Sequence, residues 1–198
     1  MSDSLAGMEP MTFHALADWE AWLADHHGTA GEAWLAIAKK GAATPTISAA
    51  EAGDVAICFG WIDSQRRGLD DSHFLQRYSP RRAGARWSQV NVDRAEALIA
   101  AGRMRPAGLA QIETAKGDGR WAAAYPAQRD AKTPEDLEAA LADNPAAAAR
   151  FATLDKTGRY SVILKLTSAP SAAARAKRLA ALTDLLASGA PIPPPQVG

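Results

Sequence analysis

Cysteine is nearly absent from this sequence, and so are long apolar runs and any surplus of charge. Cys58 is the one cysteine among 198 residues, which excludes an internal disulfide framework and fits a reducing compartment. No run approaches the roughly 18 apolar residues that a membrane-spanning helix needs. The N-terminal residues also lack the basic and apolar regions of a signal peptide. We therefore expect a globular protein without a membrane span, located in the cytoplasm.

Basic residues are missing from the first part of the chain, where none precedes Lys39. The 22 basic and 22 acidic residues of the whole sequence cancel to a formal net charge of +0 at pH 7. Because a protein that coats nucleic acid is usually basic overall, this balance argues against a nucleic-acid partner. The acidic first segment can face a more basic region or divide the surface into two signs. Its acids are Asp3, Glu9, Asp18, Glu20, Asp25 and Glu32.

Motifs for metals and cofactors are also missing. His26 and His27 are adjacent, so on a helix they point about 100° apart, which is poor geometry for one ion. His14 and His73 have no Cys or His at ligand spacing. No glycine pattern of a phosphate-binding or dinucleotide-binding loop follows a predicted strand. We therefore predict no metal and no cofactor, and we interpret Cys58, on an apolar helix face, as a buried structural thiol.

What the sequence does contain is a concentration of arginine, tryptophan and acids within residues 58–91, a stretch without lysine. Arginine forks bind carboxylate and phosphate oxygens through two parallel hydrogen bonds. A tryptophan ring adds a stacking face, and a serine at a helix start adds backbone amides. The stretch predicts a site for a carboxylate, a phosphate or a nucleotide-like ligand. Its candidate residues are Trp61, Asp63, Arg77, Arg81, Arg82, Trp87, Ser88 and Asn91.

A structural interpretation of the same residues stays open. The arginines can form a solvated hairpin face whose surface ion pairs contribute little to stability. Asp63 can orient an arginine or act as a general base. Alternatively, it can form a buried ion pair that stabilises the hairpin without catalysis.

Local patterns predict the elements of the N-terminal part. Residues 18–27 fit an amphipathic helix with Asp18 as N-cap and its tryptophans in the core. Residues 33–39 fit a buried strand, and Ser48 with Glu51 forms a capping box for the next helix. Residues 61–79 read as a β-hairpin, and Ser88 and Pro106 begin two further helices.

The C-terminal part contains shorter helical patterns. Thr133 with Pro134, and Asn144 with Pro145, each supply an N-cap followed by proline at the first helical position. Residues 159–167 fit helix and strand periodicity equally well. A last helix is expected over residues 171–187.

These elements predict an α+β fold, in which a small, largely antiparallel sheet is packed by helices and followed by a C-terminal helical module. The predicted divisions are an N-terminal domain over 1–117, a linker over 118–133, a helical module over 134–189 and a disordered tail over 190–198.

Several motifs within this frame resemble a known family. CFGWID, SPRR, RWSQVN and AGRMRPAG, in this order, resemble the YdeI/OmpD-associated family of bacterial proteins, which is named for bacteriocin protection. The similarity runs from about residue 19 through residue 121, and a looser one covers residues 134–189. The resemblance implies a role in tolerance of antimicrobial peptides or envelope stress, and no established reaction.

Three functions follow as hypotheses. The first is a non-catalytic cytoplasmic protein that binds a small anionic ligand. The second is an enzyme acting on a small phosphorylated or carboxylated substrate, with Asp63 as base and arginines as electrostatic clamps. The third is a nucleic-acid-binding module that uses arginines and interleaved aromatics.

Overall fold

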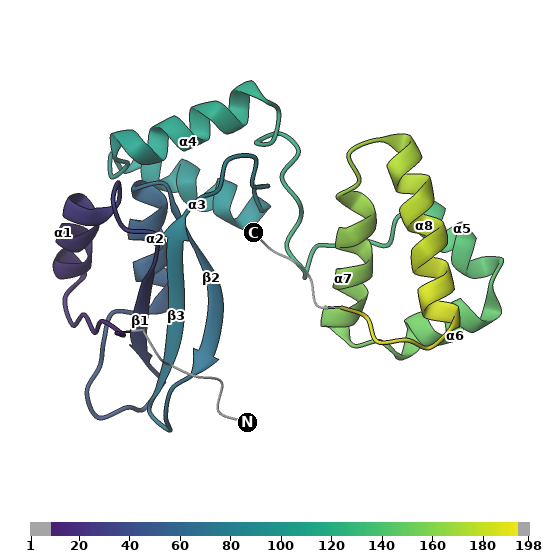
Figure 1. The fold of residues 1–198 in the computed structure, drawn as a ribbon, viewed down its shortest axis with the longest axis horizontal. Coiled ribbons are helices and arrows are strands. Elements are labelled where there is room, and N and C mark those ends of the chain that lie inside the picture. Colours follow the sequence, from purple (N-terminus) through teal and green to yellow (C-terminus); the bar gives the residue numbers. More distant parts are fainter. Residues whose placement is uncertain (1–8, 194–198) are drawn as a thin grey trace. The chain divides into compact units, whose positions relative to one another are not determined.

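The computed structural model describes residues 9–193 (Figure 1). The chain divides into two compact units. Within the described residues, the N-terminal unit comprises 9–87 and 91–123, and the C-terminal unit comprises 88–90 and 124–193. The predicted fold class is confirmed, because the described residues form a three-stranded antiparallel sheet with helices in the first unit and only helices in the second.

Two helices of the N-terminal unit begin and end close to their predicted positions. α1 (Leu16–His26) starts two residues before the predicted boundary, so Asp18 lies in its first turn and is not the N-cap. α2 (Ala49–Cys58) has the predicted capping box, in which the Ser48 side chain accepts from the Glu51 amide and the Glu51 side chain accepts from the Ser48 amide. Gly60 follows with a φ of 76°, a left-handed conformation that stops the helix.

The sheet has the strand order β1-β3-β2. β1 (Ala33–Ala38) pairs with β3 (His73–Pro80), which also pairs with β2 (Trp61–Gly68) to make the predicted hairpin. The register of β2 against β3 shifts between Asp63 and Arg66, so β2 carries a bulge there.

Side chains on the two faces of the sheet meet different surroundings. Tyr78 points toward α1 and α2, where its hydroxyl donates to the Ala49 carbonyl and its ring lies 5.6 Å from that of Trp19. On the opposite face, Trp34, Ala36 and Leu75 form a smaller buried cluster. Trp19 is fully buried as predicted.

Trp22 was predicted to share the burial of Trp19, and it is only half-buried. It stacks on Trp19 with ring centroids 5.4 Å apart and on His26 at 4.6 Å. Three residues along a helix turn the side chain by about 300°, so Trp22 lies at the edge of the apolar face and not at its centre.

The N-terminal unit is completed by α3 (Gln89–Ala100), whose first two residues cluster with the other unit, and α4 (Pro106–Gly117). α4 begins at the predicted proline and packs closely against the end of α2. A Cβ atom on Gly108 would lie 2.2 Å from the Cys58 carbonyl oxygen, so only glycine allows this approach.

Four helices make up most of the C-terminal unit: α5 (Glu135–Ala142), α6 (Pro145–Thr153), α7 (Lys156–Thr167) and α8 (Ala172–Ala187). α8 contacts the other three helices (Figure 1). Leu137, Val162, Leu166 and Leu186 are fully buried in their shared core.

One of the two predicted N-caps in this unit is confirmed, since Asn144 accepts from the Ala147 amide. Ser171, for which no cap was predicted, accepts from the Ala174 amide and is the N-cap of α8. The prediction that Thr133 caps a helix was wrong, because Pro134 has extended backbone angles and is itself the N-cap of α5. The residue before a proline, here Thr133, is biased away from helical backbone angles. Pro134 is also outside the helix, which begins at Glu135.

The ambiguous segment 159–167 is helical and belongs to α7. Asp155 caps this helix by accepting from the Gly158 amide, and five consecutive residues, 160–164, are buried. In the predicted tail, residues 190–193 contain no helix or strand, and the Pro193 carbonyl accepts from the buried Ser161 hydroxyl. The rest of that tail, residues 194–198, lies outside the described residues.

Over residues 9–193 there is no helix with the length and apolarity that crossing a membrane requires. The acidic first segment meets arginines at two places: Glu32 pairs with Arg77 at 2.7 Å, and Glu20 pairs with Arg105 at 2.5 Å. Hydrogen bonding from Arg77 holds the pKa of Glu32 below its usual value.

Candidate functional site

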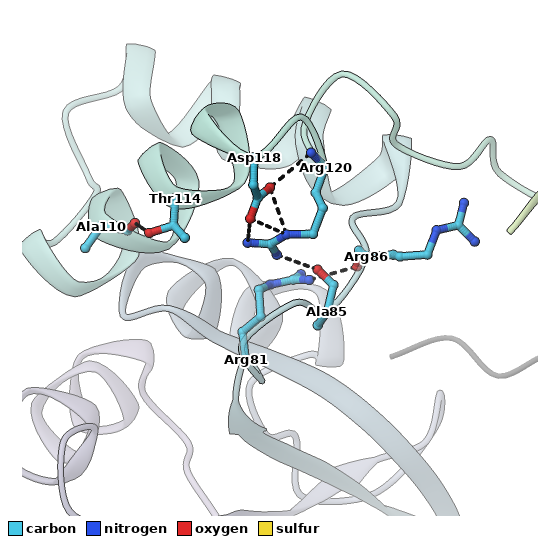
Figure 2. Close-up of polar contacts among 7 residues, drawn as sticks. All are labelled: Arg81, Ala85, Arg86, Ala110, Thr114, Asp118 and Arg120. Atoms are coloured by element: carbon cyan, nitrogen blue, oxygen red, sulfur yellow. Dashed lines mark hydrogen bonds and ion pairs between the residues drawn. The ribbon is translucent and has the colours of Figure 1, made fainter. Parts of the chain in front are cut away.

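Two of the predicted site residues, Arg81 and Trp87, are in direct contact in the loop that follows β3. Arg81 is buried, and its guanidinium carbon lies 3.8 Å from the centroid of the Trp87 ring. Its Nη1 donates to the Arg86 carbonyl at 3.1 Å. In Figure 2, Arg81 lies beneath this loop, and the side chain of Arg86 extends away from the other labelled residues. The buried Arg81 side chain therefore stabilises the conformation of this loop through its contacts with Trp87 and the Arg86 carbonyl.

A second arginine, which the sequence did not indicate, contributes to the same loop. Arg120 Nη1 donates to the Ala85 carbonyl at 2.7 Å, across 35 residues of sequence. Figure 2 shows its guanidinium group held by the Asp118 carboxylate, with Nε 2.8 Å and 2.9 Å from the two oxygens. This hydrogen bonding lowers the pKa of Asp118. Trp121 then packs edge-on against Trp87 with centroids 4.8 Å apart.

The hairpin residues among the predicted set lie in separate surroundings. Trp61 is buried beside α1, and its indole Nε1 donates to the His27 carbonyl at 3.1 Å. Arg77 pairs with Glu32 and donates to the Ser64 hydroxyl at 3.2 Å. Asp63 lies opposite Tyr78 in the sheet register, so it points to the other face from Arg77.

The alternative of a buried ion pair at Asp63 is wrong, because this residue is exposed and makes no ion pair among the described residues. Arg82 is also exposed. Ser88 forms an isolated bridge with Tyr125, and Asn91 is half-buried in α3. Anion binding by this set of residues stays a prediction.

A cavity lies within the C-terminal unit. It has a volume of about 730 Å³, within the range of pockets that hold small molecules. The segment 127–133, α6, α7 and Val90 at the start of α3 line it, and we call it the C-terminal pocket. Its principal lining residues are Arg129, Phe151, Lys156, Arg159, Tyr160 and Ile163.

Three cations and no acid line the C-terminal pocket within the described part of the chain. Lys156 makes no ion pair with any described residue, and Arg129 pairs only with its exposed neighbour Asp130, at 3.2 Å. Arg159 is fixed by donating to two carbonyls at the end of α6, those of Ala152 and Leu154, at 2.6 Å and 3.1 Å. The result is a positively charged, solvent-exposed rim.

The deeper part of the C-terminal pocket is apolar. Tyr160 and Ile163 are buried, and Phe151 is half-buried. The Tyr160 hydroxyl donates to the Pro126 carbonyl at 3.0 Å, which fixes the ring. The Arg159 guanidinium lies 5.9 Å from the centroid of Phe151, at the limit of cation–aromatic attraction.

Sequence reasoning missed this pocket because it depends on the conformation of residues 156–163. Lys156, Arg159, Tyr160 and Ile163 stand at i, i+3, i+4 and i+7, so a helix brings them to one face, whereas a strand separates them. Once the capping signal of Asp155 is recognised, this spacing is visible in the sequence.

The described residues give little support to a metal site or to a reactive cysteine. They contain no group of three His, Cys, Asp or Glu side chains arranged to hold a metal ion. Cys58 is buried as predicted, and burial raises the pKa of its thiol.

Two family models match separate parts of the chain, and the boundary between the two structural units, at residues 123 and 124, falls between the matched segments. Residues 11–111 match a family model described as a domain of unknown function (DUF8412). Residues 130–189 match the model of the bacteriocin-protection family, YdeI or OmpD-associated. No curated protein and no solved structure matches the chain. The resemblance to the bacteriocin-protection family is therefore confirmed, and it rests on the C-terminal segment, since the N-terminal motifs match the other model.

Proposed function

The chain belongs to the family of the domain of unknown function DUF8412, and from this premise we propose that it is a non-catalytic protein that binds a small anionic ligand in its C-terminal pocket. The observation that carries the proposal is the charge of the lining: its described residues include three cations and no acid, and of the three only Arg129 is paired with an acid, the neighbouring Asp130. Charges of one sign at the mouth of a low-dielectric cavity raise the local concentration of ligands of the opposite sign.

Two of these cations have complementary properties. Arg159 is held in place by its two carbonyl acceptors, so little side-chain entropy remains to be lost on binding. Lys156 is an exposed, mobile point charge without an ion-pair partner among the described residues. Together they offer one fixed planar cation and one adaptable cation to the same ligand.

The lining also favours binding over catalysis. It offers hydrogen-bond donors and apolar surface, and its described residues include no carboxylate or imidazole to move a proton. The same pocket falls mostly within the segment that matches the bacteriocin-protection family. We extend the proposal to a role in tolerance of antimicrobial peptides, exercised in the cytoplasm, where a single buried thiol such as Cys58 stays reduced.

Thermal unfolding with inorganic phosphate, pyrophosphate and succinate tests anion binding. Binding to the native state raises the midpoint, and at a hundredfold excess over Kd it adds about 2.7 kcal/mol of stability. Lys156→Gln should remove most of the shift. Lys177→Gln, which removes the same charge from an exposed position on α8, should leave the shift intact.

The same experiment tests the loop that follows β3, which contains Arg81, Arg82 and Arg86. Arg82→Gln removes an exposed charge from the predicted N-terminal site without touching the C-terminal pocket. An anion-dependent shift that vanishes in Arg82→Gln and survives in Lys156→Gln would move the binding site to the loop. No shift with any of the three anions, and none with an aromatic carboxylate, would refute the proposed function.

A further inference from the structure

Along α7, the lining of the C-terminal pocket changes from charged to apolar side chains, and this change indicates a class of ligand. Lys156 and Arg159 lie in the first turn, and Tyr160 and Ile163 follow on the same face. One turn of helix is about 5 Å long, so the charged and apolar ends of the cavity are about that far apart. A ligand that satisfies both ends has an anionic group attached directly, or by a short link, to an apolar body.

The apolar end has flat and fixed surfaces. Tyr160 is buried, and its hydroxyl is tied to the Pro126 carbonyl, so the ring cannot turn aside. Phe151 lies on α6, the helix whose last carbonyls hold Arg159. Two aromatic rings and one immobilised guanidinium plane therefore border the same cavity. Flat, preorganised walls favour a flat ligand, because aromatic rings attract each other in offset or edge-to-face geometry beyond the effect of buried area.

We propose that the ligand of the C-terminal pocket is a planar aromatic anion, with its carboxylate or phosphate at Lys156 and Arg159 and its ring against Phe151, Tyr160 and Ile163. This inference rests on the proposed function, since it specifies which anions the pocket prefers. It excludes two simpler classes as preferred ligands: inorganic anions, which leave the apolar floor unused, and saturated carboxylates, which gain only from buried area.

A matched pair of probes isolates the aromatic contribution. Naphthalene-2-carboxylate and decahydronaphthalene-2-carboxylate carry the same charge and a similar carbon skeleton, and only the first is planar and aromatic. Isothermal titration of the full chain should give at least tenfold tighter binding of the aromatic acid. Naphthalene-2-carboxamide, which is neutral, should bind at least tenfold more weakly than the aromatic acid, because the cations then have no partner.

Two variants assign the contributions to side chains. Phe151→Leu should reduce the aromatic preference at least threefold while phosphate binding is kept, and Phe74→Leu, which replaces another half-buried phenylalanine in β3, should change neither. Lys156→Gln should weaken both carboxylates and phosphate alike. Because Phe151→Leu can disturb folding, the unchanged protein provides a second readout. The Ile163 methyl resonances should move upfield with the aromatic acid, through its ring current, and not with the saturated acid.

The outcomes separate the two proposals. If both carboxylates bind equally and depend on Lys156, the aromatic preference is refuted and the proposed function stands. If the aromatic acid binds without shifting Ile163 and without dependence on Lys156 or Phe151, the ring lies elsewhere and the inference is again refuted. If neither phosphate nor any carboxylate binds, the proposed function fails, and the inference fails with it.

Discussion

At the scale of single residues, Gly108 shows how closely two helices approach in the N-terminal unit. A Cβ atom there would lie 2.2 Å from the Cys58 oxygen and 2.7 Å from the Ile57 oxygen, distances that no real contact allows. We expect Gly108→Ala to force α2 and α4 apart and to cost roughly 2 to 3 kcal/mol, as overpacked sites do. Urea unfolding measures the loss.

Gly117→Ala in the same helix is the control for Gly108→Ala. A Cβ atom on Gly117 meets nothing within 4 Å. Alanine there should be neutral or should stabilise the helix by up to about 1 kcal/mol. Equal effects at both positions would show that helix propensity, and not the close approach, governs Gly108.

Cys58 gives a second prediction at this scale. The thiol is buried at the end of α2, and burial raises its pKa, so little reactive thiolate forms at neutral pH. A thiol reagent should modify native protein very slowly and denatured protein within the mixing time. Fast stoichiometric labelling of the native protein at pH 7 would restore Cys58 as a candidate nucleophile.

At the scale of elements, an ion pair joins α5 to α8 in the C-terminal unit. Arg175 donates through Nε and Nη2 to both oxygens of Asp136, at 2.7 Å and 2.8 Å. These hydrogen bonds lower the pKa of Asp136. Both side chains are about one third exposed, so solvent screens the pair and we expect it to contribute only about 1 kcal/mol.

The pH dependence of this pair has a definite sign. Because the pKa of Asp136 is lower in the folded state, the contribution is complete above the unfolded pKa of about 3.9 and disappears as pH falls through the folded value. Asp136→Asn should therefore destabilise the protein at pH 7 and much less at pH 2.5, as measured by urea unfolding. Asp184→Asn, at an exposed position on α8, should show no such difference. A constant penalty at both pH values would mean that packing, and not charge, links the helices.

At the scale of the whole molecule, the formal net charge of +0 at pH 7 removes the mutual repulsion that keeps proteins apart. We expect self-association, measured by light scattering, to be greatest near pH 7 and to fall at pH 9. The double variant Lys40→Glu and Lys177→Glu makes the net charge more negative by four, since each change contributes two. The self-association of this double variant should be greatest at a lower pH than that of the unchanged protein. If the pH of greatest self-association does not move, a specific interface is responsible.

The sequence alone determined the features that depend on neighbours along the chain. Ser48 with Glu51, Asn144 with Pro145, and Gly60 each set a helix boundary through hydrogen bonds or backbone angles within four residues. The β2–β3 hairpin followed from turn composition in the same local way. Burial of Cys58 followed from its place on an apolar helix face.

Tertiary structure alone decided which distant residues meet. Residues 159–167 satisfied both periodicities, and only the packed structure shows that their helix buries five consecutive residues, 160–164. Arg120 reaches the Ala85 carbonyl across 35 residues, a contact that no local pattern encodes. The C-terminal pocket likewise requires α6 and α7 to pack beside the segment 127–133. Capping and turn formation are short-range interactions that the chain specifies locally, whereas a binding cavity exists only after long-range packing has placed its walls.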